Sequence, residues 1–320
     1  MKILVTGSTG LIGSAVVRRL DQIHDVYANR AGDGTRLDLR EPDTTLRLVL
    51  QLEPDVVVHC AACIGGIAAQ KADPSMPVLD NLVMGAWVID ACAKVQSKLV
   101  FLSSSTVYPM TLGLECAAEE SWPRRPDPQY RGVGGMKIYL EELIDFYRET
   151  FGLRAVILRP TAVYGPGDRG FSGNGHVIPD LLRRADAGEL PLMVWGDGKT
   201  VRDFVYVDDV ADAVAAVINR EAWGGVFNVG SGEQTTIAKL ADEVLLAVHG
   251  AHKIVELEDR SSGGLLRFDA TQPVAIPWRA VSIVHIRDVL GWAPTVTLHD
   301  GLRRTLSWWR TQRSAKGGRA

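Results

Sequence analysis

One short segment of the chain, "QYRGVGGMK" at residues 129–137, combines a tyrosine, three glycines and a lysine. A phenol beside an ammonium group can act as a proton donor, because the positive charge favours the phenolate form. Tyr130 and Lys137 are seven residues apart, which in a continuous helix is a rise of about 10 Å, against about 6 Å for four residues. Glycine forms helices poorly and permits unusual backbone angles. We therefore expect a bulge or loop that brings Tyr130 back toward Lys137.

A second set of residues suits the binding of a dinucleotide. In "VTGSTGLIGSAVVRRL" three glycines at intervals of three follow an apolar strand and open a helix. Glycines at this place allow a tight turn and a close approach of the backbone to a pyrophosphate, which the helix N-terminus attracts. The pattern predicts cofactor contacts from Gly7, Gly10, Leu11, Ile12 and Gly13. The alternative interpretation is a glycine-rich turn without a ligand.

The end of the second apolar run bears on the choice of cofactor. NAD-binding folds of this kind place a carboxylate there for the ribose hydroxyls, whereas this chain has Ala28, Asn29 and Arg30. An arginine suits a 2′-phosphate, so the sequence favours NADP(H), with NAD as the alternative and Arg30 then a surface charge. In "LDLRE", Asp38 and Leu39 follow at the place where such a fold meets the adenine.

Short apolar runs separated by segments of helical character predict a doubly wound parallel sheet. Parallel strands covered on both faces are continuously apolar rather than alternating. The fold class is therefore α/β, a Rossmann-type sheet at about 1–170 with a smaller C-terminal α/β substrate lobe at 171–320. A segment at about 203–230 is predicted to cross back to the first domain. The runs are "KILVTG" (2–7), "DVYANR" (25–30), "DVVVHCAA" (55–62), "KLVFLSSS" (98–105) and "AVILRPTAVYGP" (155–166).

Composition excludes several classes of protein. The 320 residues are 46% hydrophobic and 23% charged with a net charge of −3, which argues against disorder and gives no reason to expect a nucleic-acid partner. The start of the chain has no charged leader and no apolar run is long enough for a membrane span, so we expect a cytoplasmic protein without membrane contact. Cys60 and Cys63 form a CxxC without a second pair, which favours packing thiols over a metal or redox site.

Several motifs along the chain resemble the extended short-chain dehydrogenases, the NAD-dependent epimerase/dehydratase family. The resemblance covers nearly the whole chain and is greatest to the GDP-L-fucose synthase branch. Members of this kind act on nucleotide-diphosphate sugars. The matching stretches are "AACIGGI" (61–67), "SSSTVYP" (103–109), "RPTAVYGP" (159–166), "GHVIPDLLRR" (175–184), "VWGDGKTVRDFVYVDDVA" (194–211) and "NVGSG" (228–232).

The resemblance implies roles for residues in these motifs. It makes Ser104 the catalytic serine and His176 an acid for epimerisation, with a helix cap as the alternative for His176. Thr106 stands where the branch has a second epimerisation group, a cysteine, and a hydroxyl is a much weaker acid than a thiol.

The same resemblance implies binding residues. Ala61 and Ala62 would contact the cofactor, while Arg184, Trp195 and Arg202 would contact the substrate, the arginines at its diphosphate; a surface ion pair is the alternative for Arg202. In the C-terminal lobe Gln272 and Val274 stand where the branch has a lysine and an aspartate.

Counting along the helix identifies the lysine of the cofactor site. Members of the family have an aromatic residue and a glycine fourteen and fifteen positions after that lysine, and counting from Lys137 gives Phe151 and Gly152. Lys137 therefore has the role of the family lysine, and Val133 occupies the tyrosine position. Tyr130 is the first candidate for the acid, with Tyr108, His176 or a site without hydride chemistry as alternatives.

The resemblance implies an NADP(H)-dependent enzyme that reduces a nucleotide-linked 4-keto-6-deoxysugar, with or without epimerisation. Redox-neutral, NAD-dependent epimerase or dehydratase chemistry is the second hypothesis. A cofactor-binding protein without turnover is the third, supported by the displaced tyrosine. Relatives often pair through the helix that carries the lysine and the helix before it, so a homodimer is expected.

Overall fold

The fold is described from a computed structural model, which describes residues 1–29, 37–63, 75–109, 118–121, 123–172, 176–251, 253–254, 264–272 and 274–317. Six parallel strands form the main sheet in the order β10-β5-β4-β3-β1-β2. The order reverses between β1 and β3, which are neighbours in the sheet, and this confirms the expected Rossmann-type fold class. The strands are β1 (Lys2–Thr6), β2 (Asp25–Ala28), β3 (Val56–His59), β4 (Lys98–Leu102), β5 (Ala155–Pro160) and β10 (Val226–Val229).

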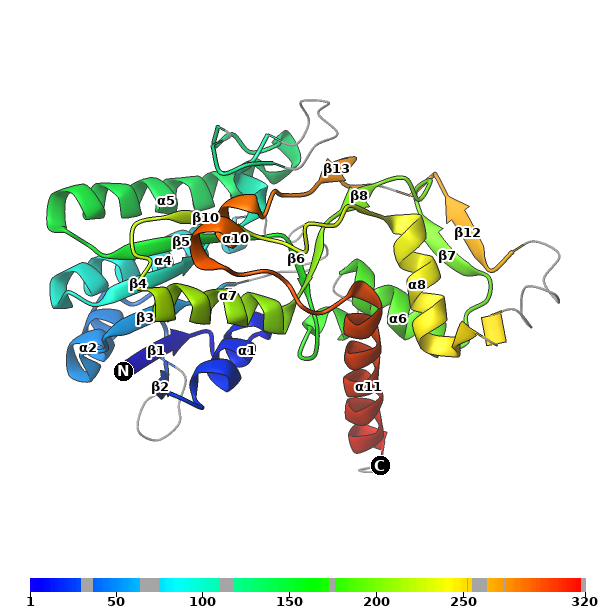
Figure 1. Ribbon diagram of the computed structural model, residues 1–320, viewed down its shortest axis with the longest axis horizontal. Helices are drawn as coiled ribbons and strands as arrows, with labels where there is room; N and C mark the ends of the chain where they lie inside the picture. The colour runs from blue at the N-terminus through cyan, green and yellow to red at the C-terminus, as the bar shows by residue number, and fades with distance from the viewer. Residues whose placement is uncertain are drawn as a thin grey trace.

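Helices cover both faces of this sheet, and alternate strand residues enter two separate cores. Ile3 and Val5 pack under α1 and α7, whereas Leu4 between them packs on the other side with α2, α4 and α5 (Figure 1). Both faces are therefore apolar, which explains the continuous apolar runs in the sequence. The helices are α1 (Leu11–Leu20), α2 (Pro42–Leu52), α4 (Met76–Val95), α5 (Arg131–Phe151) and α7 (Val207–Arg220).

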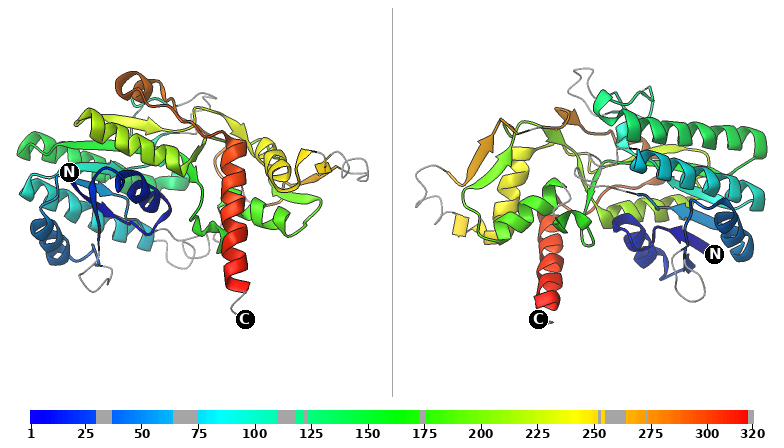
Figure 2. Two further views of the ribbon diagram at one scale, coloured as in Figure 1. Left: turned by 60° about the horizontal axis from the view of Figure 1, so that its bottom comes forward. Right: turned by 180° about the vertical axis from the view of Figure 1, so that it is seen from behind.

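A smaller lobe follows, built on α6, α8 and α11, which contact one another around a third core. In Figures 1 and 2 helix α11 projects away from the main sheet and carries the C-terminus. Helix α7 and strand β10 come after residue 170 yet pack on the main sheet; the division into two domains stays a prediction. The elements of this lobe are α6 (Val177–Asp186), β7 (Leu192–Trp195), β8 (Val201–Arg202), β11 (Thr235–Thr236), α8 (Ile237–His249), β12 (Leu266–Asp269), β13 (Trp278–Arg279) and α11 (Leu298–Gly317).

Short elements connect the two parts of the chain. Strands β6 and β9 pair in parallel next to the main sheet, and α10 packs against β10. Within the residues that the structure describes, none of the helices combines the length and apolar character that a membrane span requires. The remaining short elements are η1 (Ser105–Val107), η2 (Pro128–Tyr130), β6 (Ala162–Tyr164), η3 (Arg169–Ser172), β9 (Phe204–Tyr206) and α10 (Val284–Leu290).

Candidate active site

Three glycines form the turn between β1 and α1. Gly7 has a φ of +67°, in the region that favours glycine. A Cβ on Gly7 would lie 2.6 Å from the backbone nitrogen of Ala61, and one on Gly13 would lie 2.2 Å from the carbonyl oxygen of Gly7. Only glycine therefore permits this turn at both positions.

The end of this turn suits a phosphate group. Gly10 is the N-cap of α1 and offers no side chain to cap the helix, and the first turn contains no acidic residue. The backbone N–H groups of Leu11 and Ile12 have no partner within the helix and lie at the positive end of its dipole. The expected dinucleotide site therefore fits the residues present, with the pyrophosphate at the start of α1.

The region after β2 bears on the cofactor's ribose. The side chain of Asn29 is buried: its Oδ1 accepts a hydrogen bond of 3.1 Å from the Gly7 N–H, and its Nδ2 donates one of 3.3 Å to the Leu37 carbonyl. Asn29 thus braces the glycine turn and cannot also reach outward. Arg30, the predicted partner of a 2′-phosphate, lies outside the described residues.

Four other predicted cofactor residues lie near this turn. Leu39 and Ala61 are buried in one small cluster, and the Ala61 N–H donates a hydrogen bond of 3.2 Å to Thr6 Oγ1. Ala62 is exposed. Asp38 is exposed too, and Arg40 donates to it through Nε at 3.0 Å and Nη2 at 2.6 Å. The structure thus gives Asp38 an ion-pair partner within the chain.

Ser104 and Thr106 follow the carboxyl end of β4. Ser104 is half-buried, and its Oγ accepts a hydrogen bond of 3.2 Å from the Thr106 N–H, which caps η1. The Thr106 hydroxyl is buried and has no hydrogen-bond partner among the described residues. The Ser104 hydroxyl hydrogen remains available to an acceptor at the edge of the sheet.

Lys137 reaches the same edge from α5. Its Nζ donates a hydrogen bond of 2.7 Å to the carbonyl oxygen of Leu102, the last residue of β4, and lies 4.8 Å from the centroid of the Phe101 ring. Burial lowers the pKa of Lys137 to about 8, and the negative charge of Glu141 offsets part of this effect. The structure therefore brings an amine that titrates near neutral pH to the strand end that Ser104 follows.

Tyr130 does not approach Lys137 through a bulge, which corrects the expectation from the sequence. Helix α5 is continuous from Arg131, and Tyr130 ends the short helix before it. The reason lies in Gly134, where a Cβ would be 2.5 Å from the Thr106 carbonyl oxygen. That glycine lets a regular helix pack closely on η1 and does not bend it.

A buried polar network that sequence reasoning missed lies beside these residues. Glu141 is fully buried, accepts a hydrogen bond of 3.0 Å from Arg159 Nε, and is hydrogen-bonded by the Ser103 hydroxyl. The Tyr108 hydroxyl accepts from Arg159 Nη1 at 2.8 Å and donates to Asn228 Oδ1 at 2.7 Å. Burial raises the pKa of Tyr108 to about 12, so this alternative acid is occupied in the core. One arginine within an apolar strand was the sequence signal.

His176 is oriented by a buried carboxylate. It occupies the N-cap position of α6 but makes no capping hydrogen bond. Its Nδ1 lies 2.9 Å from Asp168 Oδ1, which also accepts a hydrogen bond of 2.8 Å from the Gly170 N–H. The hydrogen bond with Asp168 raises the pKa of His176. An exposed imidazole held by a buried carboxylate can act as a general acid or base.

Of the predicted substrate residues, Arg184 has its donors occupied within the lobe. Its Nε donates to Glu189 at 2.8 Å, its Nη1 to Asp180 at 3.1 Å, and its Nη2 to the Met193 carbonyl at 2.6 Å. Two carboxylates neutralise this guanidinium. Trp195 ends β7 with an exposed side chain.

Arg202 has no carboxylate partner among the described residues. It is 6% exposed, and within that part of the chain its guanidinium makes one hydrogen bond, from Nη1 to the Val201 carbonyl at 2.6 Å. Arg279, which sequence reasoning missed, pairs with it across β8 and β13. Burial and then the positive charge of Arg279 lower the pKa of Arg202 to about 10.

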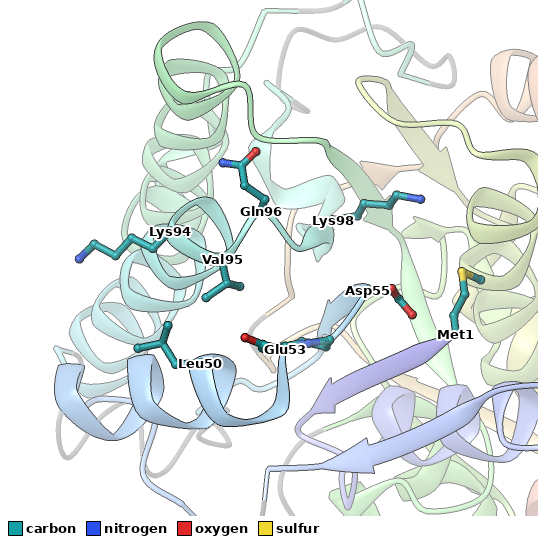
Figure 3. Close-up of a pocket in the computed structure, with 9 residues that line it drawn as sticks. Met1, Leu50, Glu53, Asp55, Lys94, Val95, Gln96 and Lys98 are labelled. Atoms are coloured by element: carbon teal, nitrogen blue, oxygen red, sulfur yellow. The ribbon is translucent and has the colours of Figure 1, made fainter.

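A surface depression of about 540 Å³ lies at the opposite, amino edge of the main sheet (Figure 3), lined by Met1, Glu53, Asp55 and Lys98 among others. The glycine turn and Lys137 are at the carboxyl edge, where ligands bind in open α/β sheets. The depression is therefore separate from the candidate site. The part of the chain that the structure describes holds no group of three or more potential metal ligands.

The chain is similar to known proteins along nearly its whole length. The model of the NAD dependent epimerase/dehydratase family matches residues 3–230. A probable GDP-L-fucose synthase 1 of rice is 33% identical over 322 residues, covering 96% of this chain and 92% of that protein. A dTDP-4-dehydro-6-deoxy-D-allose reductase of Streptomyces bikiniensis is 32% identical, with 96% of each chain covered. The UDP-glucose 4-epimerase of Thermus thermophilus, solved with NAD, has a TM-score of 0.78 at 28% identity over 97% of this chain and 99% of that one.

The matches extend over nearly the full length of the chain and of these enzymes. They confirm the family resemblance, the expectation of an enzyme, and a nicotinamide dinucleotide as the class of cofactor. The chain belongs to the NAD dependent epimerase/dehydratase family.

Proposed function

We propose that the protein is an NADP(H)-dependent oxidoreductase that reduces the C4 ketone of a nucleotide-linked 4-keto-6-deoxysugar. One observation carries the proposal: the Lys137 ammonium is hydrogen-bonded to the carbonyl end of β4, which Ser104 follows by two residues. A cation and a hydroxyl then lie together at the carboxyl edge of the sheet. The relatives named for GDP-L-fucose synthesis and for a dTDP-linked ketosugar reductase support this substrate class.

When bound, the dinucleotide supplies the hydride. The residues of the chain orient the reactants: the glycine turn and the start of α1 hold the pyrophosphate, and Lys137 holds the nicotinamide ribose. Ser104 donates a hydrogen bond to the sugar oxygen at C4, which stabilises negative charge as it develops there.

The proton for that oxygen needs a donor other than a tyrosine at position 133, where this chain has valine. We assign it to Lys137, whose pKa of about 8 keeps it protonated at neutral pH while leaving it able to release a proton. Tyr130 is the alternative donor. It is the N-cap residue of α5, two helical turns before Lys137, about 10 Å along the helix axis.

Epimerisation would require acid–base groups at the carbon atoms next to the ketone. His176 with Asp168 is one such group, whereas Thr106 replaces the thiol expected for the second. A hydroxyl exchanges protons poorly near neutral pH. We therefore propose reduction as the main reaction, with epimerisation limited to what His176 supports.

The choice of NADP(H) rests on the end of β2. Asn29 turns inward to Gly7, and no carboxylate occupies residues 28 to 30. Arg30 follows Asn29 in the sequence, and an arginine at this position favours a 2′-phosphate. Arg30→Asp is expected to weaken NADPH binding far more than NADH binding.

The reaction is tested with the purified protein, NADPH and a panel of GDP-, UDP- and dTDP-linked 4-keto-6-deoxysugars. We expect NADPH to be consumed with one or more of them, and NMR of the product to show a hydroxyl at C4. Ser104→Ala should bind NADPH normally and turn over slowly. Failure of the wild-type protein to consume NADPH with any of the panel would refute the reductase.

A redox-neutral, NAD-dependent epimerase or dehydratase is the second candidate, favoured by the likeness to the Thermus UDP-glucose 4-epimerase bound to NAD. Such an enzyme keeps its cofactor through the cycle. Mass spectrometry of the small molecules released on denaturation discriminates the two, since tightly held NAD would support this candidate.

We also propose a homodimer formed through α4 and α5, which pack side by side on the outer face of the sheet (Figure 1). Leu79 and Trp87 on α4 and Tyr139 and Phe146 on α5 are exposed apolar side chains. Light scattering should give twice the chain mass, and Trp87→Glu with Phe146→Glu should give monomers. The cytoplasmic location stays a prediction.

A further inference from the structure

We propose that Arg279 is a second diphosphate-binding residue, acting with Arg202, and that the ring of Tyr130 positions it. The inference rests on the proposed nucleotide-sugar function and concerns how this chain holds the diphosphate of that substrate.

The first step is the pairing of β8 with β13. The two strands are parallel, with Val201 opposite Trp278 and Arg202 opposite Arg279. Side chains of directly paired residues leave a sheet on the same face. Both guanidinium groups therefore lie on one face of the β11-β8-β13 sheet, at the junction between the main sheet and the smaller lobe (Figure 1).

The second step is that neither arginine is neutralised by another of the described residues. No carboxylate of the described residues forms an ion pair with Arg202 or Arg279, and the buried Nε of Arg279 has no hydrogen-bond partner. Two neighbouring cations repel, and a buried charge without a partner is costly. A ligand with two negative phosphates would reduce both the repulsion and the cost of burial. Each guanidinium group can donate two hydrogen bonds to one phosphate.

The third step concerns the lysine that the GDP-L-fucose synthase branch carries where this chain has Gln272. The Gln272 amide donates a hydrogen bond of 3.1 Å to Asp269 Oδ2, so it is a neutral group used within its own turn. Arg184 cannot substitute, because Asp180 and Glu189 neutralise it. Among the described residues of this lobe, Arg279 is paired directly with Arg202 and can supply the positive charge that Gln272 lacks.

The fourth step explains Tyr130. The Arg279 Cζ lies 5.3 Å from the centroid of its ring, a distance that suits a cation–π contact. Tyr130 also packs against a buried cluster that includes Val107 and Ile276, which restricts its position. Tyr130 therefore belongs to the wall of the diphosphate site and orients the Arg279 fork.

Binding of inorganic pyrophosphate, measured by calorimetry, tests the pair. Saturating NADPH, or NAD if that binds more tightly, is present so that the turn at Gly7 is occupied. Arg279→Gln should weaken pyrophosphate binding by about 10- to 100-fold, because a charge-assisted pair of hydrogen bonds is lost. Arg279→Lys keeps the charge without the fork and should weaken it by about 3- to 10-fold. Arg267→Gln, an exposed arginine of β12, is the matched control and should bind like the wild type.

The same variants are titrated with GDP, UDP and dTDP, and their loss of affinity should be equal for all three, because Arg279 reads phosphate and not base. Wild-type affinity in Arg279→Gln, or a loss confined to one base, would overturn the inference. Cofactor affinity reports folding; if Arg279→Gln does not bind cofactor, Arg279→Lys decides, and undiminished pyrophosphate affinity there would also overturn it.

The outcomes separate this inference from the proposed function. Wild-type protein that binds neither pyrophosphate nor any nucleoside diphosphate would refute both. Wild-type binding that Arg279→Gln leaves intact refutes the role of Arg279 alone. Weakened binding in Arg279→Gln together with no reduction of any 4-keto-6-deoxysugar supports the diphosphate site and refutes the reductase.

Discussion

Arg159 and Arg202 are two buried arginines in different surroundings. Arg159 is 2% exposed and Arg202 is 6% exposed. Arg159 donates to Glu141 and to the Tyr108 hydroxyl, whereas Arg202 meets one backbone carbonyl and a second arginine. Burial alone would lower both pKa values; Glu141 turns the shift of Arg159 upward, while Arg279 lowers the pKa of Arg202 further, to about 10.

If the proposed diphosphate site is correct, Arg159 carries a charge used for folding and Arg202 carries a charge used to bind a ligand. A buried cation whose donors meet a buried anion completes its electrostatics when the chain folds. A buried cation beside another cation can gain a negative partner from a bound ligand. Two arginines that are both buried can therefore have different roles, and the groups that they contact distinguish those roles.

Arg159→Met and Arg202→Met should separate the two roles with the largest effect. Arg159→Met leaves Glu141 buried without its partner and should lower the free energy of unfolding by about 3–5 kcal/mol. Arg202→Met removes a repelled charge, so thermal unfolding should occur at the same or a higher temperature while pyrophosphate binding is lost. Calorimetry measures both properties. Equal destabilisation by the two variants would remove the distinction.

Lys137 is intermediate between Arg159 and Arg202. Its ammonium group donates to one carbonyl oxygen, and the charge of Glu141 offsets only part of the effect of burial on its pKa. Lys137→Ala should reduce turnover by about 10²- to 10⁴-fold, as expected for a lost proton donor. Because its pKa is lowered from the ordinary lysine value to about 8, wild-type activity should be full below that pH and decline as the pH rises through it.

Lys137→Arg serves as the control, since arginine stays protonated throughout this range. Its residual activity should show no decline near pH 8. A wild-type profile that stays flat to pH 10 would assign the proton to another group.

Substitutions at Gly134 and Gly135 test whether the close packing of α5 on η1 contributes to stability. Helix α5 also carries Glu141, the partner of Arg159. A Cβ at Gly134 would meet the Thr106 carbonyl oxygen at 2.5 Å, while one at Gly135 would meet nothing within 4 Å. Gly134→Ala should lower the free energy of unfolding by about 1–3 kcal/mol, and Gly135→Ala should raise it by up to about 1 kcal/mol. Chemical denaturation measures both, and an equal response would mean that the helix start is loosely packed.

These residues also show what the sequence could reveal. The glycine turn was predictable because a Cβ at Gly7 or Gly13 collides with backbone, so no other residue type fits. Lys137 was predicted by counting back from the aromatic residue and glycine that end this helix in the family, and α5 does end at Phe151, with Gly152 as its C-cap. Gly134 was misread, since a glycine needed for close packing looks the same in a sequence as one needed for a bend.

The charged residues of the smaller lobe were harder to interpret. Arg279 lies in a strand of two residues, too short for a periodic signal, and its pairing with β8 is distant in sequence. The partner of Arg184 was visible, because Asp180 precedes it by four residues, the spacing of an ion pair on a helix. Counting such local partners would have separated Arg184 from Arg202.

The smallest effect is expected from substitutions of Tyr130, which test the surroundings of Arg202 and Arg279. If its ring orients Arg279 at 5.3 Å, Tyr130→Phe keeps that contact and should lower kcat by less than about threefold, whereas Tyr130→Leu removes it and should raise KM for the nucleotide sugar by about three- to fivefold. Steady-state kinetics at saturating NADPH gives both numbers. A phenol that donated the proton would instead cost about 10²- to 10⁴-fold in kcat on conversion to Phe, with KM little changed. That result would return Tyr130 to the reacting end of the site and leave Arg279 to act without it.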